Sequence, residues 1–315
     1  MQAPAPAPPV ILRDTAAARP APRSSVEWPT WLVIFLVHAA WLALLAAYQT
    51  LGPVLAAPLL VVALTWHGSM SHEIVHGHPT RVTWFNDLLA QWPVALLTPY
   101  FLFKENHLMH HHNERLTLPG IDPESFFIRP AAWRQKGRLG RALAWANMTM
   151  AGRLALDPAR AVWHLLRHIG RGVRERDHAR SARFLIHCAL ATAVVMSAER
   201  WFAVPPAHYL VIAYLSHSLL WLRAFFEHRP HPDAAKRSVI VESNWLFQIL
   251  FLNNNFHAVH HIHPQMPWYQ LKSEYHRHRA RYLQENGHFA YRGYRDWMKY
   301  LCKPVAAPWH PHPPE

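Results

Sequence analysis

Three short histidine clusters are the part of this 315-residue sequence best suited to chemistry. "HEIVH" carries two histidines four residues apart, and "HLMHH" and "HAVHH" each carry three with the spacing i, i+3, i+4. In a helix these offsets place side chains on one face, about 5–6 Å apart at Cβ. The histidines are His72, His76, His107, His110, His111, His257, His260 and His261.

Eight imidazoles at these spacings indicate a site for more than one metal ion. Histidine is the commonest metal ligand in proteins, whereas a single tetrahedral zinc takes only four ligands. Eight ligands suit two ions that each keep room for an outside molecule. Because imidazole binds iron, zinc, copper and nickel, the ligand type alone does not name the metal. The two cysteines, Cys188 and Cys302, are too few for a cysteine-bound iron–sulfur cluster.

Each histidine cluster adjoins an apolar segment, and the longest of these predict membrane helices. Residues 28–72 contain no Asp, Glu, Lys or Arg and are long enough for two crossings, which we predict at 28–49 and 54–71. A second pair is predicted at 184–198 and 201–222. The expected fold class is all-α: an integral membrane bundle of four transmembrane helices in two hairpins, with a cytoplasmic histidine-rich cap.

The distribution of basic residues predicts how this bundle is oriented. The chain has 32 Lys and Arg against 19 Asp and Glu, and only Arg200 falls in the short turns at 50–53 and 199–206. The positive-inside rule therefore places both termini and the histidine clusters in the cytoplasm. A basic face beside anionic lipid explains the excess charge, and no nucleic-acid motif accompanies it. The same asymmetry argues against a large soluble helical protein.

The remaining segments predict accessory elements and two tails. Residues 88–103 are apolar but short and contain two prolines, so we expect a re-entrant or interfacial segment. Residues 153–183 predict an amphipathic cytoplasmic helix. We expect residues 1–25, rich in Ala and Pro, to be a disordered tail, residues 26–290 to be one membrane domain, and residues 291–315 to be a C-terminal cytoplasmic tail ending in a loose "WHPHPPE".

The ordered set HEIVH, HLMHH and HAVHH resembles the membrane fatty acid desaturase/hydroxylase superfamily over about residues 30–285. The segment "HHIHPQMPWYQL" is similar to the segment after the third histidine box in bacterial desaturases and carotenoid ketolases. The resemblance implies a diiron centre on the cytoplasmic side of the bundle. It also implies a ninth ligand after the fourth transmembrane helix, where His228 of "RAFFEHRPHP" matches best. Some acyl-CoA desaturases have Asn before that histidine; Glu227 stands here, which disfavours acyl-CoA as the direct substrate.

Carboxylates and amides near the clusters are candidates for orienting the metal ligands. A metal-bound histidine commonly donates its other ring N–H to a carboxylate. An ordinary solvated loop charge is the alternative interpretation of these residues, and the second cluster also allows a register ending on His112. His67 could line a substrate channel or simply pack. The candidate orienting residues are Glu73, Glu105, Asp122, Glu124, Glu227 and Asn253.

The resemblance predicts an O2-dependent oxidoreductase with two non-haem iron ions that desaturates a fatty acyl chain of a membrane lipid in the bacterial inner membrane. No residue is predicted to be a nucleophile or a protein-derived general base. Because the chain has no cysteine cluster and no GxGxxG motif, we expect electrons from a separate donor such as ferredoxin with its reductase. A hydroxylase or ketolase acting on a carotenoid, alkane or other lipid is the alternative, and a non-enzymatic membrane metal carrier is an alternative of another class.

Overall fold

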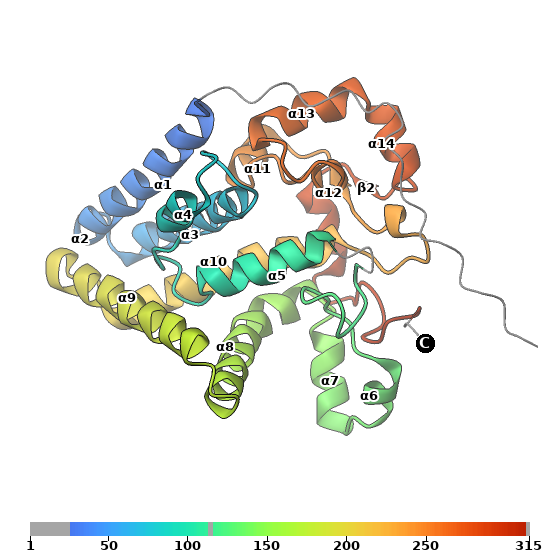
Figure 1. Ribbon diagram of the computed structural model, residues 1–315, viewed down its shortest axis with the longest axis horizontal. Helices are drawn as coiled ribbons and strands as arrows, with labels where there is room; N and C mark the ends of the chain where they lie inside the picture. The colour runs from blue at the N-terminus through green and yellow to red at the C-terminus, as the bar shows by residue number, and fades with distance from the viewer. Residues whose placement is uncertain (1–25, 113–115, 313–315) are drawn as a thin grey trace, which may run out of the picture.

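The computed structural model describes residues 26–112 and 116–312, so the tail expected at residues 1–25 lies outside the described part. The fold is mostly helical with few strands, as the sequence predicts (Figure 1). One small parallel pair, β1 (Ile240–Val241) and β2 (Ala290–Tyr291), joins distant segments. The helices are α1 (Trp28–Ala46), α2 (Tyr48–Leu51), α3 (Pro53–Val75), α4 (Thr83–Ala90), α5 (Tyr100–His112), α6 (Pro130–Arg134), α7 (Arg138–Ala146), α8 (Met150–Arg174), α9 (His178–Phe202), α10 (Pro206–Glu227), η1 (Ala234–Lys236), α11 (Trp245–Leu250), α12 (His257–Ile262), α13 (Trp268–Arg277), α14 (Arg279–Glu285) and η2 (Tyr294–Tyr300).

Four helices in the described part, α1, α3, α9 and α10, are long and apolar enough to cross a membrane. They expose large hydrophobic side chains that water would not favour, which indicates contact with lipid. The expectation of an all-α membrane bundle with four transmembrane helices is confirmed. Examples of these exposed side chains are Leu32, Phe35, Val54, Leu55, Leu59, Leu185, Ile186, Met196, Leu210 and Val211.

The spanning helices form two hairpins that turn at the same end of the bundle. Helix α1 packs on α3, and α9 packs on α10. The two turns touch, because the Gln49 side-chain amide donates to the carbonyl oxygen of Ala203 at 2.6 Å and the Tyr48 hydroxyl lies 2.8 Å from Nδ1 of His208. The opposite end of the bundle therefore carries the ends of α3 and α10 that lead into the histidine clusters.

The second hairpin begins and ends at other residues than the sequence predicts. Helix α9 continues to Phe202, past the uncharged run at 184–198, and α10 begins at Pro206 instead of residue 201. Ala203 ends α9 in the left-handed region with φ 53°. Proline is favoured in the first turn of a helix because the N–H that it lacks would have no intrahelical partner there. The hydropathy of Trp201 and Phe202 suits either helix, so composition misassigned these two residues, whereas the turn itself lies within the predicted range 199–206.

Residues 91–99, between α4 and α5, form a non-helical segment that enters the bundle. Its backbone carbonyls are bound by side chains of the spanning helices: the Tyr209 hydroxyl donates to Val94 at 2.8 Å, and Nε2 of His187 lies 2.8 Å from the carbonyl oxygen of Leu96. Irregular backbone is tolerated at membrane depth only where protein satisfies its polar groups. Val94 and Leu96 are buried, which agrees with the re-entrant interpretation.

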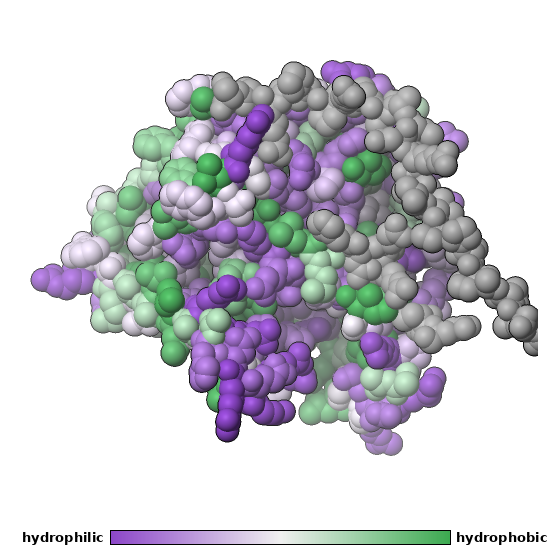
Figure 2. Space-filling model, in the orientation of Figure 1, coloured by the Kyte–Doolittle hydropathy of each residue, from purple (hydrophilic) through white to green (hydrophobic). Residues whose placement is uncertain are grey.

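The elements outside the bundle gather at its histidine end. Helix α8 is amphipathic, as predicted, but it spans Met150–Arg174 rather than 153–183. In the orientation of Figure 1, hydrophobic side chains are prominent over α1–α3 and hydrophilic ones gather over α8 and α6 (Figure 2). Residues 291–312 pack against the rest of the chain: Trp297 and His310 are buried, and the backbone of His310 pairs with Ile128. The expectation of a loose end is therefore wrong for Trp309 and His310.

Candidate metal centre

The nine predicted ligands come from four separate segments that converge at the end of the bundle. His72 lies in the last turn of α3 and His76 follows it, so the membrane helix itself presents the first cluster. Helix α5 carries the second cluster and α12 the third, and His228 directly follows α10. The structure brings all nine imidazoles together, although the printed sequence separates them by as many as 189 positions, from His72 to His261.

The nine imidazoles divide into two adjacent groups, each with its ligand atoms within 4.8 Å of one another. The i, i+3, i+4 spacing lets one helix serve both groups: His107 and His111 enter the first, whereas His110 enters the second. The rings of His111 and His261, one from each group, stack with centroids 4.2 Å apart. The first group is His72, His76, His107, His111 and His260, and the second is His110, His228, His257 and His261.

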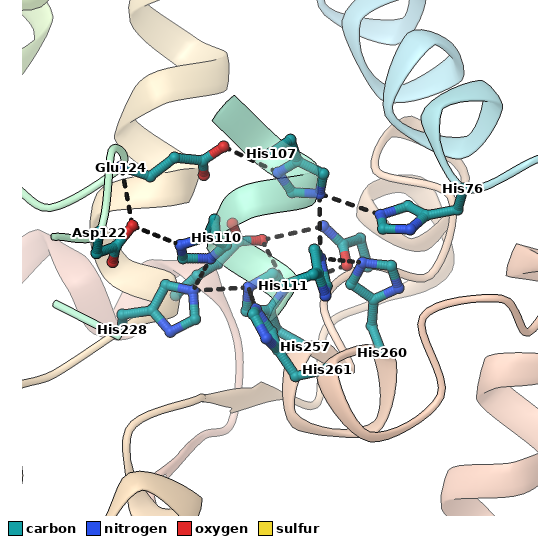
Figure 3. Close-up of polar contacts among 12 residues, drawn as sticks. His76, His107, His110, His111, Asp122, Glu124, His228, His257, His260 and His261 are labelled. Atoms are coloured by element: carbon teal, nitrogen blue, oxygen red, sulfur yellow. Dashed lines mark hydrogen bonds and ion pairs between the residues drawn. The ribbon is translucent and has the colours of Figure 1, made fainter. Parts of the chain in front are cut away.

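Two carboxylates determine which ring nitrogens face inward (Figure 3). Nδ1 of His107 lies 2.9 Å from Glu124, and Nδ1 of His110 lies 2.9 Å from Asp122. An ionised carboxylate only accepts, so each Nδ1 carries the proton and donates it, and each Nε2 presents a bare lone pair. Backbone N–H groups of Thr117 and Glu124 hold Asp122 in place at 2.7 and 2.9 Å. This is the arrangement that orients histidine ligands toward a metal.

The inward nitrogens lie at the separation expected of ligands that share an ion. In the first group Nε2 of His107 is 3.1 Å from Nε2 of both His76 and His111. In the second, Nε2 of His228 is 3.0 Å from Nε2 of both His110 and His257. Two nitrogens at right angles, each about 2.1 Å from one ion, are about 3.0 Å apart. Lone pairs this close repel one another unless a cation lies between them, so the residues fit a metal in each group.

The electrostatics of the centre favour neutral imidazoles for most of the ligands and an ionised Glu124, with His110 as the exception. Burial, followed by the neighbouring imidazoles, lowers the pKa of most of the ligands outside the spanning helices. Burial also opposes a charge on His110, but Glu124 and Asp122 outweigh it and raise the pKa of His110 to about 8. Burial opposes ionisation of Glu124, yet His107 and His110 lower its pKa to about 2. The ligands with a lowered pKa are His76, His111, His228, His257, His260 and His261.

The other candidate orienting residues occupy different places. Glu227 pairs with Arg223 at 3.1 Å and lies 3.6 Å from Nδ1 of His257. Glu73 accepts from the backbone N–H of Trp268 at 3.0 Å, and it is 3.6 Å from His78. The structure does not bring Glu105 to the centre, because its exposed side chain pairs with Arg183.

Of the three amides at 253–255, which the sequence offers as candidates to orient the third cluster, the structure brings the second against a ligand; Ser238 and Arg223 were not singled out from the sequence. The side chain of Asn253 donates to the carbonyl oxygen of Trp268, whereas its neighbour Asn254 lies 3.1 Å from Nδ1 of His257. The hydroxyl of Ser238 lies 3.3 Å from Nδ1 of His228, and no sequence pattern marks it. The sequence could have indicated the role of Arg223, because a charged residue directly after an apolar run is expected to have a buried partner of opposite charge.

A cavity leads from the centre into the bundle. His72, His107 and His257 line one end of it, and Leu64 and Leu96 line the other. Its walls are α3, α10 and the re-entrant residues 91–98. Much of its lining away from the histidines is apolar, so an apolar group that enters it would lie close to the histidines with protein around it.

Comparison with known proteins agrees with this geometry. A family profile described as "Fatty acid desaturase" matches residues 49–293, more than three quarters of the chain. The matched range includes all nine histidines, the re-entrant segment and most of the bundle. Among curated proteins, none matches the sequence significantly. The chain therefore belongs to the fatty acid desaturase family.

Proposed function

We propose that the protein is an O2-dependent diiron oxidoreductase that desaturates a fatty acyl chain of a membrane lipid. One observation carries the proposal: two adjacent histidine groups with inward lone pairs lie at the mouth of a cavity between membrane helices. The cavity favours an enzyme over a metal carrier, since a carrier has no need of a largely apolar space beside its ligands. Hydroxylation differs from desaturation in the step after hydrogen removal, and ketolation requires a second oxidation of the same carbon, so the product distinguishes the three reactions.

The nine histidines would hold two iron ions, five ligands around one and four around the other. Iron bound there would supply the reduction of O2 and the removal of hydrogen from an unactivated carbon. The protein's own part is to hold each imidazole in one tautomer. Glu124 and Asp122 do so for His107 and His110 by accepting the Nδ1 protons.

The cavity would position the acyl chain. Helix α3 supplies Leu64, Gly68 and His72 along one wall, a rise of about 12 Å over eight residues. A carbon beside His72 would be exposed to oxidation, while the part of the chain beyond it extends toward Leu64 and Leu96. Because these walls are apolar and buried, bulk water is kept from the reacting carbon.

Electrons would come from a separate donor such as ferredoxin with its reductase. The histidine end of the molecule is rich in Arg, and a negatively charged protein would associate with it through charge complementarity. The positive-inside rule would make this end cytoplasmic, with the protein in a bacterial inner membrane. Electron transfer should then weaken as ionic strength rises, because salt screens exposed charges.

Lipid mass spectrometry of cells expressing the wild type beside His260→Ala tests the proposal, provided that a compatible donor is co-expressed. A new unsaturated lipid found only with the wild type supports desaturation, and a hydroxylated or keto lipid favours the alternative reaction. His276→Ala is the matched control, because His276 is exposed and lies outside both groups. Identical lipid profiles of wild type and His260→Ala would contradict an oxidative function.

A further inference from the structure

Two histidines in the wall of the cavity take no part in the metal centre. His67 lies on α3 and His217 on α10, and both line the cavity. They lie at the same depth: the Thr65 hydroxyl donates to the carbonyl oxygen of Ser216 at 3.5 Å, and an added Cβ on Gly68 would meet Leu220 at 2.5 Å. His67 precedes His72 by five residues, so this level is about 7.5 Å below the first metal ligand.

Both imidazoles are buried, and Nε2 of each has no hydrogen-bond partner within the part of the chain that the structure describes. His67 is 5% exposed and His217 6%. The nearby hydroxyls of Ser71 and Ser216 donate to carbonyls of their own helices at 3.0 Å, and among the described residues neither is hydrogen-bonded to these Nε2 atoms. An unsatisfied polar group is costly inside a membrane protein, and an ionisable side chain there indicates function.

We propose that His67 and His217 bind an uncharged oxygen, a hydroxyl or keto group, on the chain that enters the cavity. The inference rests on the proposed function, in which a lipid chain occupies this space. Nε2 of a neutral imidazole either donates or accepts a hydrogen bond, depending on the tautomer, and a hydroxyl group can pair with either form. The Thr98 hydroxyl, 3.4 Å from Nδ1 of His217, helps to fix that ring. The substrate would thus already be oxygenated several carbons from the position that is oxidised.

A charged group is a poorer match at this level. The nearest basic side chain in the cavity wall toward the metal centre, Arg223, is already paired with Glu227 at 3.1 Å. A carboxylate placed between neutral imidazoles would have no counter-ion of its own. An unsubstituted chain would leave both Nε2 atoms unsatisfied, and a site built to bind an oxygen rejects the analogue that lacks it.

The test measures binding to the purified full-length, iron-loaded protein in lipid nanodiscs. The probes are a saturated fatty acyl ester and a series of its isomers with one hydroxyl or keto group moved along the chain, each displacing a fluorescent fatty acid. We expect the best oxygenated isomer to bind about tenfold or more tightly than the unsubstituted ester, with a clear optimum in position.

Variants assign the preference to the two histidines. His67→Phe and His217→Phe should abolish it while the unsubstituted ester binds at least as tightly, because an unsatisfied polar group has been removed. His217→Gln should keep much of the preference, since the side-chain amide can replace the hydrogen bond of the imidazole. This variant also keeps the test decisive if the Phe variants do not fold. His276→Phe is the control: it is an exposed histidine outside the cavity and outside both histidine groups.

The outcomes separate this inference from the proposed function. Equal binding of oxygenated and unsubstituted esters by the wild type would overturn the inference, as would a preference that survives both Phe variants. Oxidation of unsubstituted chains without any preference would leave the proposed function standing and remove the inference alone. A positional preference without turnover would support the oxygen site and count against the oxidoreductase.

Discussion

Asp122 and Glu124 act on the metal centre without touching a metal. Each accepts a proton-bearing Nδ1 at 2.9 Å, which leaves Nε2 of His110 and His107 to face inward. These carboxylates lie in a loop 12 and 17 residues from their partners, where no helical periodicity links them. The sequence could therefore identify the ligands by spacing but could only suggest their orienting groups by proximity.

Replacing either carboxylate by its amide should weaken metal binding more than it changes the fold. Asp122→Asn and Glu124→Gln each lose a charged acceptor, and a loss of about 10- to 100-fold in metal affinity is expected. Chelator titration with metal analysis of the purified variants measures this. Glu199→Gln removes an exposed carboxylate 29 residues from the nearest ligand in sequence and serves as the control. Unchanged affinity in both test variants would mean that these carboxylates do not orient the ligands.

For the helices and loops, the sequence predicted which segments are present more accurately than the residues at which they begin and end. Uncharged length predicted the spanning helices, and Pro93 with Pro99 indicated that residues 88–103 could not be a fifth regular span. The depth of that segment was beyond sequence reasoning, because it depends on Tyr209 and His187 reaching it from two other helices. Tertiary hydrogen bonds of this kind leave no local pattern.

Tyr209→Phe should loosen the re-entrant segment. The hydroxyl of Tyr209 donates to Val94 at 2.8 Å and accepts from the indole N–H of Trp41 at 3.0 Å, and the side chain is fully buried. Its loss leaves both partners unsatisfied, which should lower the free energy of unfolding by about 1–3 kcal/mol. Thermal or denaturant unfolding in detergent measures the change. A variant as stable as the wild type would show that this contact does not hold the segment.

Filling the cavity at Gly68 should separate substrate binding from metal binding. Because a Cβ at Gly68 would already meet Leu220, the larger side chain of Gly68→Leu must extend into the cavity or push α3 from α10. We expect turnover to fall about 100-fold or more while the metal content stays unchanged. Gly170→Leu, at an exposed position on α8 with open space around it, is the matched control. Equal loss in both variants would place the substrate elsewhere.

At the scale of the whole molecule, two hairpins that turn at one end leave the histidines at the other. Contacts between Gln49 and Ala203 and between Tyr48 and His208 fix this arrangement. The scarcity of basic residues in the two turns predicted that the turns lie at one end of the bundle and the histidines at the other. The packing of residues 291–312 was not predictable, since Trp297 and His310 are buried by partners that lie far away in the sequence.

The orientation in the membrane can be tested with single cysteines. The turn residue Gln49 is exposed, and so is Cys302 at the histidine end. An impermeant maleimide should label Gln49→Cys, in a background without the native cysteines, on intact spheroplasts. Cys302, with Cys188 replaced, should react only after the membrane is opened. The reverse pattern would contradict a cytoplasmic metal centre.

The most direct measurement of the central claim is anomalous X-ray scattering at the iron edge, from crystals of protein purified without chelators. We expect two peaks, one among His72, His76, His107, His111 and His260 and the other among His110, His228, His257 and His261. A single peak coordinated by one group alone, or iron bound outside these histidines, would contradict that claim.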